Sequence, residues 1–474
     1  MKSGSEKLNV WFFAVLTALL GTVAALGQSA GPADTAAQPT PRPLFQDIQV
    51  VRTDPTADKN SDLVKKTASV SAISAARANT SLAGLAEVDI PGTSGILVES
   101  LDGTRVVEYG SNAAFNPASN VKIATAYAVL KTFGPDYRFP TNVWTDGVVD
   151  PSTGVLNGNL YISGRDPIFN YEHAVMIADS LNRLGIRSVQ GDLIVTDDFA
   201  MAYSSSASRT SQLLFSTLDA SKRSASATRS WLSYLSNSGK GSSMTGLASV
   251  TFTGRSYVQP LPSSLKLLFT HESAPIREIV KATLCYSNNF LAERLGDMLG
   301  GPQAVARVVQ LNAGIQPAEF FIQTSSGLGI NRVTPNAMMR VLRSLRRDLA
   351  QYRMSFADIM PVAGLDQGTL EERFDTDFAR GSVVGKTGTL GRTDGGASAL
   401  SGEINTRNGR FLFVIFNNKG SVARFRNFQN LYVSLIQGAL GGAAPFNYSP
   451  VPIDARLAKA RVVYPSLQAA LGQN

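Results

Sequence analysis

The amino-acid sequence predicts an α/β fold of the α+β type, in which helices flank an antiparallel sheet and a smaller domain is inserted. Three observations predict it. Residues 95–109 have the pattern of a hairpin, and residues 142–264 differ in pattern from their surroundings. The third observation is a series of short strand-like runs separated by turns, which is typical of an antiparallel meander. These runs are residues 381–388, 399–404 and 411–416.

The first element is a hairpin. Gly95–Ser100 and Arg105–Tyr109 are both rich in residues that favour strands, and Asp102-Gly103 lies between them. An Asp-Gly pair between two such runs is a strong signal for a tight hairpin turn.

A helix is expected next, after a loop at residues 116–119. Ile123, Ala126, Tyr127 and Leu130 follow the i, i+3, i+4, i+7 spacing that places apolar side chains on one helical face. Gly134 then suits the C-terminal cap, because glycine adopts the left-handed conformation at low cost.

The predicted insert, residues 142–264, contains short strands and one clear helix. Strands are expected at Leu160–Ile162 and Asp192–Val195, with a helix at His173–Leu184. The segment Tyr203–Ser243 is rich in serine and weakly patterned, so we expect it to be flexible or irregular.

Four further helices are expected after the insert. The last of them would close the structure by packing on the final sheet. They are expected at residues 276–299, 303–311, 335–349 and 424–440.

The N-terminus has the features of a secretory signal peptide at residues 1–27. Lys2 and Lys7 precede an apolar run from Val10 to Leu26, and small residues suit cleavage after Gly27. An uncleaved anchor is the alternative, although a run of about 17 residues is short for spanning a bilayer.

The domain organisation follows from these patterns. Residues 28–66 are rich in Ala, Pro, Thr and Ser and form a predicted disordered spacer, with a short helix expected near residues 63–82. The core is then discontinuous, and residues 443–474 form a C-terminal tail. The two core segments are residues 67–141 and 265–442.

Composition excludes several classes of protein. The chain has 474 residues, of which 44% are hydrophobic and 17% charged, as in a globular protein. Its net charge of +8 is not gathered in Lys/Arg blocks, so we expect no nucleic-acid binding. With one cysteine, Cys285, and two histidines, His173 and His271, no disulfide, metal site or cofactor is expected.

Three short motifs occur in a fixed order along the chain. They are Ser119-Asn120-Val121-Lys122, Ser287-Asn288-Asn289 and Lys386-Thr387-Gly388. In this order they match the S-x-x-K, S-x-N and K-T-G signature of penicillin-recognising serine acyl-transferases. Each motif alone is weak, because a second S-x-x-K occurs at Ser263–Lys266 and a second S-x-N at Ser180–Asn182.

The first motif predicts a nucleophile and its base. Ser119 at a helix start has Lys122 one helical turn further on, on the same side. A lysine can take the serine proton only when it is neutral, so the pKa of Lys122 must be lowered by burial and by positive charge nearby. We expect Lys386 to supply that charge and Ser287 to relay a proton to the leaving amine.

The other motif residues are predicted to bind substrate. Thr387 and Gly388 suit a strand edge that pairs with an extended peptide, where glycine permits close approach. The backbone N–H groups of Ser119 and Thr389 would form the oxyanion hole. Asn289 would hold the substrate amide, and Thr387 and Thr389 its terminal carboxylate.

Each motif also has a purely structural interpretation. Ser119 could be an ordinary helix N-cap, Ser287-Asn288-Asn289 another cap, and Lys386-Thr387-Gly388 an exposed strand end. The correct order, with each motif in the expected helix or strand context, favours the catalytic interpretation.

From about Gly95 to Asn418 the chain resembles the D-alanyl-D-alanine carboxypeptidase/endopeptidases of the penicillin-binding protein 4 type. The resemblance extends beyond the three motifs. It is carried by Pro117–Ser119 with Lys122, Asp136–Phe139, Leu160–Gly164 with Asp166-Pro167, Ser287–Glu293, Ser326–Leu328, Asn331–Pro335, Pro361–Asp366 and Gly385–Leu390. Thr324 stands where the family usually has Asp, and Arg165 interrupts a usual glycine run.

The resemblance implies a serine β-lactamase/transpeptidase-like core with an insert between the first two motifs. It implies a periplasmic enzyme without a cofactor that trims or uncrosslinks peptidoglycan stem peptides through a Ser119 acyl-enzyme. β-Lactam antibiotics would acylate the same serine. The protein would contact the membrane only transiently, during export.

Two alternatives stay open at this point. A β-lactamase or esterase could use the same core, but no deacylating base is evident in the sequence. A catalytically silent cell-wall binding module would need a broken motif, and none of the three motifs is broken.

Overall fold

The computed structural model describes residues 76–239 and 247–465. The predicted signal peptide (1–27) and spacer (28–66) lie outside the described residues, as does most of the short helix expected near residues 63–82. Among the helices of the described ranges, none combines the length and the apolar character needed to cross a bilayer.

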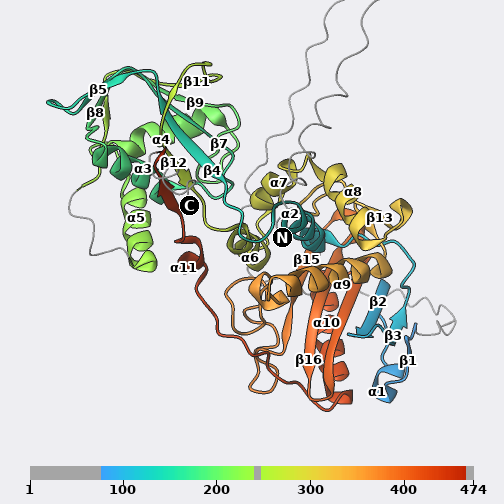
Figure 1. The fold of residues 1–474 in the computed structure, drawn as a ribbon. Helices are drawn as coiled ribbons and strands as arrows, with labels where there is room; N and C mark the ends of the chain where they lie inside the picture. Colours follow the sequence, from blue (N-terminus) through green and yellow to red (C-terminus); the bar gives the residue numbers. More distant parts are fainter. Residues whose placement is uncertain (1–75, 240–246, 466–474) are drawn as a thin grey trace, which may run out of the picture. The chain divides into compact units, whose positions relative to one another are not determined.

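The main sheet has six antiparallel strands and contains the predicted hairpin and meander (Figure 1). It confirms both of those predictions. From one edge to the other the strands are β1 (Asn79–Thr80), β3 (Arg105–Tyr109), β2 (Thr93–Ser100), β17 (Gly409–Asn418), β16 (Ala397–Thr406) and β15 (Val383–Leu390). The strand that carries Lys386-Thr387-Gly388 therefore lies at an edge.

Helices cover both faces of this sheet. One face packs on α10 (Val422–Ala439), with the short α1 (Ala83–Ala86) beside it. The other face packs on a group of five helices. These are α2 (Val121–Phe133), α6 (Ile276–Cys285), α7 (Asn289–Asp297), α8 (Pro302–Ala313) and α9 (Pro335–Gln351).

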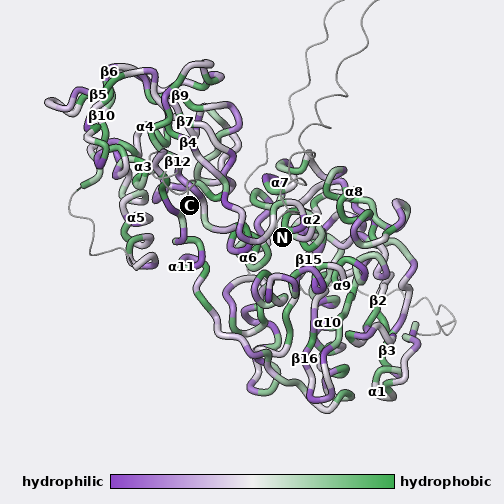
Figure 2. The backbone as a smooth tube through the Cα atoms, viewed as in Figure 1, coloured by the Kyte–Doolittle hydropathy of each residue, from purple (hydrophilic) through white to green (hydrophobic). Residues whose placement is uncertain are grey.

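The alternation of side chains along β17 produces these two cores. Phe413 and Ile415 pack with the α10 side, whereas Leu412, Val414 and Phe416 pack with the α2 and α9 side. Successive residues of a strand point to opposite faces, so a continuous apolar run is expected where both faces are covered. Burying each such side chain stabilises the fold by roughly 1.5–3 kcal/mol. Figure 2 shows both hydrophobic (green) and hydrophilic (purple) residues along helices such as α9 and α10 that cover this sheet.

A second group of elements contains most of the predicted insert. Its helices are α3 (Tyr171–Arg183), α4 (Ala207–Leu218) and α5 (Ala225–Ser238). One six-stranded sheet contains β11 (Ser256–Val258), β9 (Leu193–Val195), β7 (Leu160–Gly164), β4 (Pro140–Thr145), β12 (Lys266–Glu272) and β18 (Arg461–Val463). A four-stranded sheet contains β10 (Thr251–Phe252), β8 (Ser188–Gln190), β6 (Val155–Asn157) and β5 (Val148–Asp150).

The pairing of β12 bears on the predicted domain boundaries. β12 begins at Lys266, after the predicted end of the insert, yet pairs with β4 on one side and with β18 on the other. β18, together with the short helix α11 (Ile453–Leu457), belongs to the predicted C-terminal tail. A division at residue 264 would therefore cut through this sheet, and the boundaries given above remain a prediction.

The expectation for Tyr203–Ser243 is wrong in its described part. Two regular helices, α4 and α5, occupy it, and each has a serine as its N-cap. The Ser206 side chain accepts a hydrogen bond from Arg209 N, and the Ser224 side chain accepts one from Ala227 N. Serine disfavours helix interiors but satisfies an unpaired N–H at the first turn, so the same composition that weakens the pattern also starts the helices.

Candidate active site

An open cleft of about 670 Å³ gathers five of the predicted site residues: Ser119, Ser287, Asn289, Thr387 and Thr389. Residues from three other segments complete its lining. They are Leu328, then Gly368, Thr369, Glu371, Glu372 and Arg373, and finally Arg426, Asn427 and Asn430. The three sequence motifs, far apart in the chain, therefore meet at one cleft.

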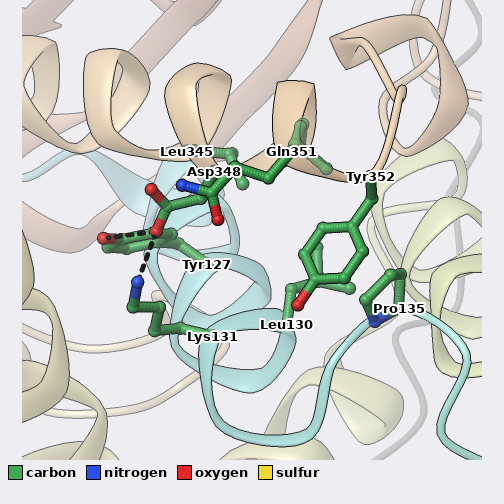
Figure 3. A pocket seen from close by; sticks show the side chains of 9 residues that line it. Tyr127, Leu130, Lys131, Pro135, Leu345, Asp348, Gln351 and Tyr352 are labelled. Carbon is green, nitrogen blue, oxygen red and sulfur yellow. Dashed lines mark hydrogen bonds and ion pairs between the residues drawn. The ribbon is translucent and has the colours of Figure 1, made fainter. Parts of the chain in front are cut away.

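A smaller cavity of about 80 Å³ lies between α2 and α9 and contains none of the motif residues. Figure 3 shows the Tyr127 hydroxyl and the Lys131 amine pointing at the Asp348 carboxylate. Lys131 Nζ lies 2.9 Å from Asp348 Oδ2, so its charge is already paired. We interpret this cavity as a gap in the packing of the two helices, lined by an ion pair, and not as a binding site.

Ser119 lies in a tight turn that the neighbouring strand holds in place. The turn is a short 3₁₀ segment, Ala118–Asn120, and Ala118 has a φ of 46°, which is rare for a residue with a side chain. Asn120 Nδ2 donates to Lys386 O at 2.9 Å. A Cβ atom on Gly388 would lie 2.5 Å from Pro117 O, so only glycine allows β15 to approach this closely.

The structure contradicts the N-cap interpretation of Ser119. Asn120 is the N-cap of α2, and Pro117 that of the preceding turn, and neither cap has a side-chain hydrogen bond. Ser119 Oγ instead lies 3.1 Å from Lys122 Nζ. The hydroxyl is thus directed at the lysine that the sequence pairs with it.

Lys122 is 1% exposed and contacts only neutral groups through its amine. Nζ lies 2.7 Å from Asn289 Oδ1 and 2.7 Å from Ser326 O. Burial lowers the pKa of Lys122 to about 7, with the charge of Glu293 opposing part of the shift. A neutral amine has two N–H donors for these two oxygens, which leaves its lone pair for the Ser119 hydroxyl.

Lys386 differs from what the sequence analysis expects. It is fully buried, and burial together with the neighbouring charge of Lys122 places the pKa of Lys386 well below its usual range. Nζ donates to Thr387 O at 2.8 Å. Burial, rather than a charge on Lys386, is therefore the main cause of the low pKa of Lys122.

Ser287 lies between two helices, and the single helix predicted over residues 276–299 is wrong. α6 ends at Cys285 and α7 begins at Asn289, because the Asn288 side chain accepts a hydrogen bond from Leu291 N and caps a new helix. Ser287 has a φ of 54°. Among the described residues, no hydrogen bond joins Ser287 Oγ to either lysine, whereas Asn289 contacts Lys122 directly.

A loop that the sequence analysis does not assign to the site completes the surroundings of Lys122. The Ser326 carbonyl accepts from Lys122, and the N–H groups of Ser325 and Ser326 donate to the Glu293 carboxylate at 3.1 and 2.9 Å. Two features of the sequence could have indicated this loop: Glu293, at the end of the second motif segment, and the segment Ser326–Leu328. Neither specifies a contact between residues 204 positions apart.

No group of three or more His, Cys, Asp or Glu side chains in the described ranges has the arrangement of a metal site. Ser119, Lys122 and the neutral oxygens around them suit nucleophilic acyl transfer, in which a neutral amine takes the serine proton. The comparisons with known proteins bear on this assignment.

A family model described as the D-Ala-D-Ala carboxypeptidase 3 (S13) family matches residues 83–212 and 244–437. The chain belongs to that family. Among its relatives, carboxypeptidase DacB of Mycolicibacterium smegmatis is 27% identical over 448 residues, covering 87% of this chain and 93% of the relative. The D-alanyl-D-alanine carboxypeptidase of Actinomadura sp. strain R39 is 24% identical, covering 68% and 77%.

Solved structures share the fold. Bd3459, a predatory endopeptidase of Bdellovibrio bacteriovorus solved with bound penicillin G, has a TM-score of 0.66 and 22% identity, covering 78% of this chain and all of that one. Penicillin-binding protein 4 of Haemophilus influenzae has a TM-score of 0.54 and 19% identity, covering 73% and 97%. The shared fold confirms the predicted serine β-lactamase/transpeptidase-like core.

Membership of the S13 family confirms the resemblance to the penicillin-binding protein 4 type. It also confirms that the protein is an enzyme of the serine-type D-Ala-D-Ala carboxypeptidase class. The departure at Thr324 has a local explanation. Thr324 Oγ1 accepts from Gly327 N at 3.1 Å and donates to Leu328 O at 2.8 Å, so a hydroxyl at this position stabilises the turn.

Proposed function

We propose that Ser119 is the acylated nucleophile of a D-Ala-D-Ala carboxypeptidase that acts on peptidoglycan stem peptides. The observation that carries this proposal is the buried Lys122 amine, 3.1 Å from Ser119 Oγ and with a pKa lowered to about 7. Near neutral pH about half of such lysines are unprotonated and able to act as a base.

Acylation begins with attack of Ser119 Oγ on the carbonyl carbon of the penultimate D-alanine. The Ser119 proton moves to Lys122 Nζ as the C–O bond forms. The N–H groups of Ser119 and Thr389 stabilise the oxyanion, and each such donor is worth about 3 kcal/mol of barrier. The C–N bond then breaks, and the proton held by Lys122 passes to the leaving amine, with Ser287 as the relay, so that D-alanine departs.

Deacylation repeats these steps with water. Lys122, neutral again, takes a proton from a water molecule that attacks the ester carbonyl, and the ester bond to Ser119 breaks. The proton returns to Ser119 Oγ, and the shortened peptide leaves with a carboxylate. Asn289 binds the substrate amide, and the strand edge at Thr387 and Gly388 pairs with the extended peptide, supported by the position of β15 at the edge of the sheet. Thr387 and Thr389 hold the terminal carboxylate of the substrate.

The same site would also cut D-alanyl cross-links and react with β-lactam antibiotics. The Bdellovibrio relative that shares the fold is described as an endopeptidase and as acylated by penicillin G, which supports this extension. A substrate in the cell wall requires the enzyme to work outside the cytoplasm. We therefore propose that residues 1–27 act as a signal peptide for export and that the protein contacts the membrane only during that step.

Intact-mass analysis after exposure to benzylpenicillin tests the proposal. One adduct is expected per chain, mapping to Ser119 and lost in Ser119→Ala. An adduct that persists in this variant, or that maps to Ser263 of the second S-x-x-K, would overturn it.

A further inference from the structure

The outer face of α9 gathers positive charge that is dispersed along the sequence. Arg343, Arg346 and Arg347 follow the i, i+3, i+4 spacing that places side chains on one helical face. Arg343 and Arg347 are exposed, and Arg346 is partly exposed. The cleft that contains Ser119 is lined by other residues. These three arginines therefore belong to a surface outside that cleft, which we call the α9 arginine face.

Each arginine of this face shares a buried carboxylate with a cation from another segment. The three groups are Glu99 with Arg343 and Arg105, Glu403 with Arg346 and Arg410, and Asp348 with Arg347 and Lys131. Two cations to one carboxylate leave a surplus of positive charge at Glu403 and at Asp348. The surplus at Glu99 is smaller, because Arg105 also pairs with Glu108.

Burial weakens two of these carboxylates as counter-charges. Burial raises the pKa of Glu99 and the pKa of Glu403, although arginines lie beside both. Glu99 is 5% exposed and Glu403 is 3% exposed. The surface that meets solvent is therefore positive, with guanidinium groups outside and carboxyl groups beneath them.

The charge extends over a surface and does not line a pocket. Glu99 lies opposite Leu412, which lies opposite Glu403, so the two carboxylates are two strands apart, about 10 Å. None of the large apolar side chains of α9, a helix described over its whole length, is exposed. A helix that binds a lipid surface inserts such side chains into it. An extended polar surface with surplus cations instead suits a water-soluble or hydrated polyanion.

We propose that the α9 arginine face is a docking surface for the peptidoglycan polymer, where it binds carboxylates of stem peptides other than the one being cut. This inference rests on the proposed function and adds a second contact with the same substrate. The planar fork of a guanidinium group matches a carboxylate. A polymer held at this face raises the local concentration of its stem peptides at the cleft.

Cosedimentation with insoluble purified peptidoglycan tests the proposal with the full chain. Every sample carries Ser119→Ala, so that the polymer stays intact. The variant Arg343→Gln/Arg346→Gln/Arg347→Gln removes the surplus charge but leaves each buried carboxylate with its other cation. Thermal unfolding checks that this variant is folded; if it is not, Arg346→Gln/Arg347→Gln replaces it.

The matched control removes the same charge from the insert. It is Arg209→Gln/Arg229→Gln/Arg255→Gln, in which all three arginines are exposed. The affinity of the α9 variant for peptidoglycan should fall by about 10-fold at low ionic strength, or about fivefold for the double variant, because exposed charge contacts are lost. The affinity of the control should stay within about twofold of the parent.

Two further conditions identify the interaction. At about 0.5 M salt, screening should remove the difference between the parent and the α9 variant. Peptidoglycan whose carboxylates have been converted to amides should also bind the two equally. The variant with lysine at all three α9 positions keeps the charge without the fork, and its affinity should lie between those of the parent and the glutamine variant.

The outcomes separate this inference from the proposed function. Equal affinity of the parent and the α9 variant, or an equal loss in the control, would overturn the docking surface. Binding to vesicles with an anionic phospholipid that depends on these arginines, without such dependence on peptidoglycan, would assign the face to lipid and overturn it as well. With Ser119 restored, fluorescent penicillin should label the α9 variant at the wild-type rate. A wild-type enzyme that penicillin does not label would overturn the proposed function instead.

Discussion

Two fully or almost fully buried lysines in the same helical layer have opposite surroundings. Lys281, on α6, has a carboxylate partner: its Nζ lies 2.7 Å from Asp366 Oδ2, and the carbonyl oxygens of Ala357 and Met360 lie at 2.8 and 2.6 Å. Lys122, on α2, has only neutral oxygens within hydrogen-bond distance. Burial without a paired anion lowers the pKa of Lys122, as the proposed role of base requires, whereas Lys281 is held in an ion pair that suits a structural role.

The largest expected effect is on catalysis at Lys122. Lys122→Arg retains a positive charge but cannot give up its proton, so acylation by a fluorescent penicillin should slow by about 10²–10⁴-fold. Thermal unfolding of the same sample checks that the variant is folded. Near-normal labelling of a folded Lys122→Arg protein would remove Lys122 from the role of base.

The matching change at Lys281 should affect stability instead. Lys281→Met leaves the Asp366 carboxylate buried without its cation, at an expected cost of about 3–5 kcal/mol in the free energy of unfolding. Urea denaturation measures this cost. The double variant Lys281→Met/Asp366→Asn should recover part of it, and the folded fraction should still react with penicillin. If Lys281→Met abolished acylation at unchanged stability, the contrast between the two lysines would fail.

The pH dependence of acylation sharpens the contrast, because in the proposed mechanism only the neutral form of Lys122 can accept the Ser119 proton. With a pKa of about 7 in the free enzyme, the second-order rate of acylation should fall about tenfold per pH unit below 7 and level off above it. The unfolded chain keeps this proton up to about pH 10.4. The folded protein therefore binds fewer protons between about pH 7 and 10.4, so this group makes the free energy of unfolding rise with pH across that window.

Acylation rates between pH 5 and 9 test the first of these expectations. Denaturation curves at several pH values test the second when wild type is compared with Lys122→Met. A flat rate profile would show that Lys122 does not titrate in this range.

The smallest expected effect comes from Glu293. Its charge raises the pKa of Lys122, so Glu293→Gln should shift the acid limb of the rate profile to lower pH while retaining one acceptor for the Ser325 and Ser326 N–H groups. The plateau rate should change by less than about tenfold. A shift of the limb to higher pH would show that Glu293 acts on Lys122 in some other way.

The sequence predicts the elements of this enzyme better than it predicts their contacts. Strand-like runs and the turn residues between them predict the hairpin and the β15–β17 meander. Both signals depend only on residues close together in the sequence. The three motifs predict Ser119, Lys122 and Asn289 as neighbours, and the contacts of Lys122 agree. Their catalytic roles stay predictions that the experiments above test.

What the sequence does not predict depends on tertiary contacts. The Ser326 carbonyl at Lys122 and the guanidinium of Arg426 at Thr389 come from segments with no motif, and no local pattern pairs them with the site. The break at Ser287 was missed because an apolar helical pattern continues across it, and the Asn288 cap outweighs that pattern. The helices α4 and α5 are not predicted because serine, a weak helix former, is frequent inside them, whereas the caps at Ser206 and Ser224 and the burial of apolar side chains such as Leu214 stabilise them.

The order of strands in the main sheet has a consequence for when the enzyme can first become active. β2 lies between β3 and β17, and Asn417 Nδ2 donates to Ser94 Oγ, a residue 323 positions earlier. A chain made from its N-terminus contains Ser119 and Lys122 long before it contains the strands that hold them in place. Loop closure over such a distance is slow, and the turn that contains Ser119 is held by β15, which is synthesised late. The polypeptide therefore carries Ser119 and Lys122 in an unassembled form until most of it has been synthesised, and we expect a truncated product that lacks β15–β17 to be unreactive towards penicillin.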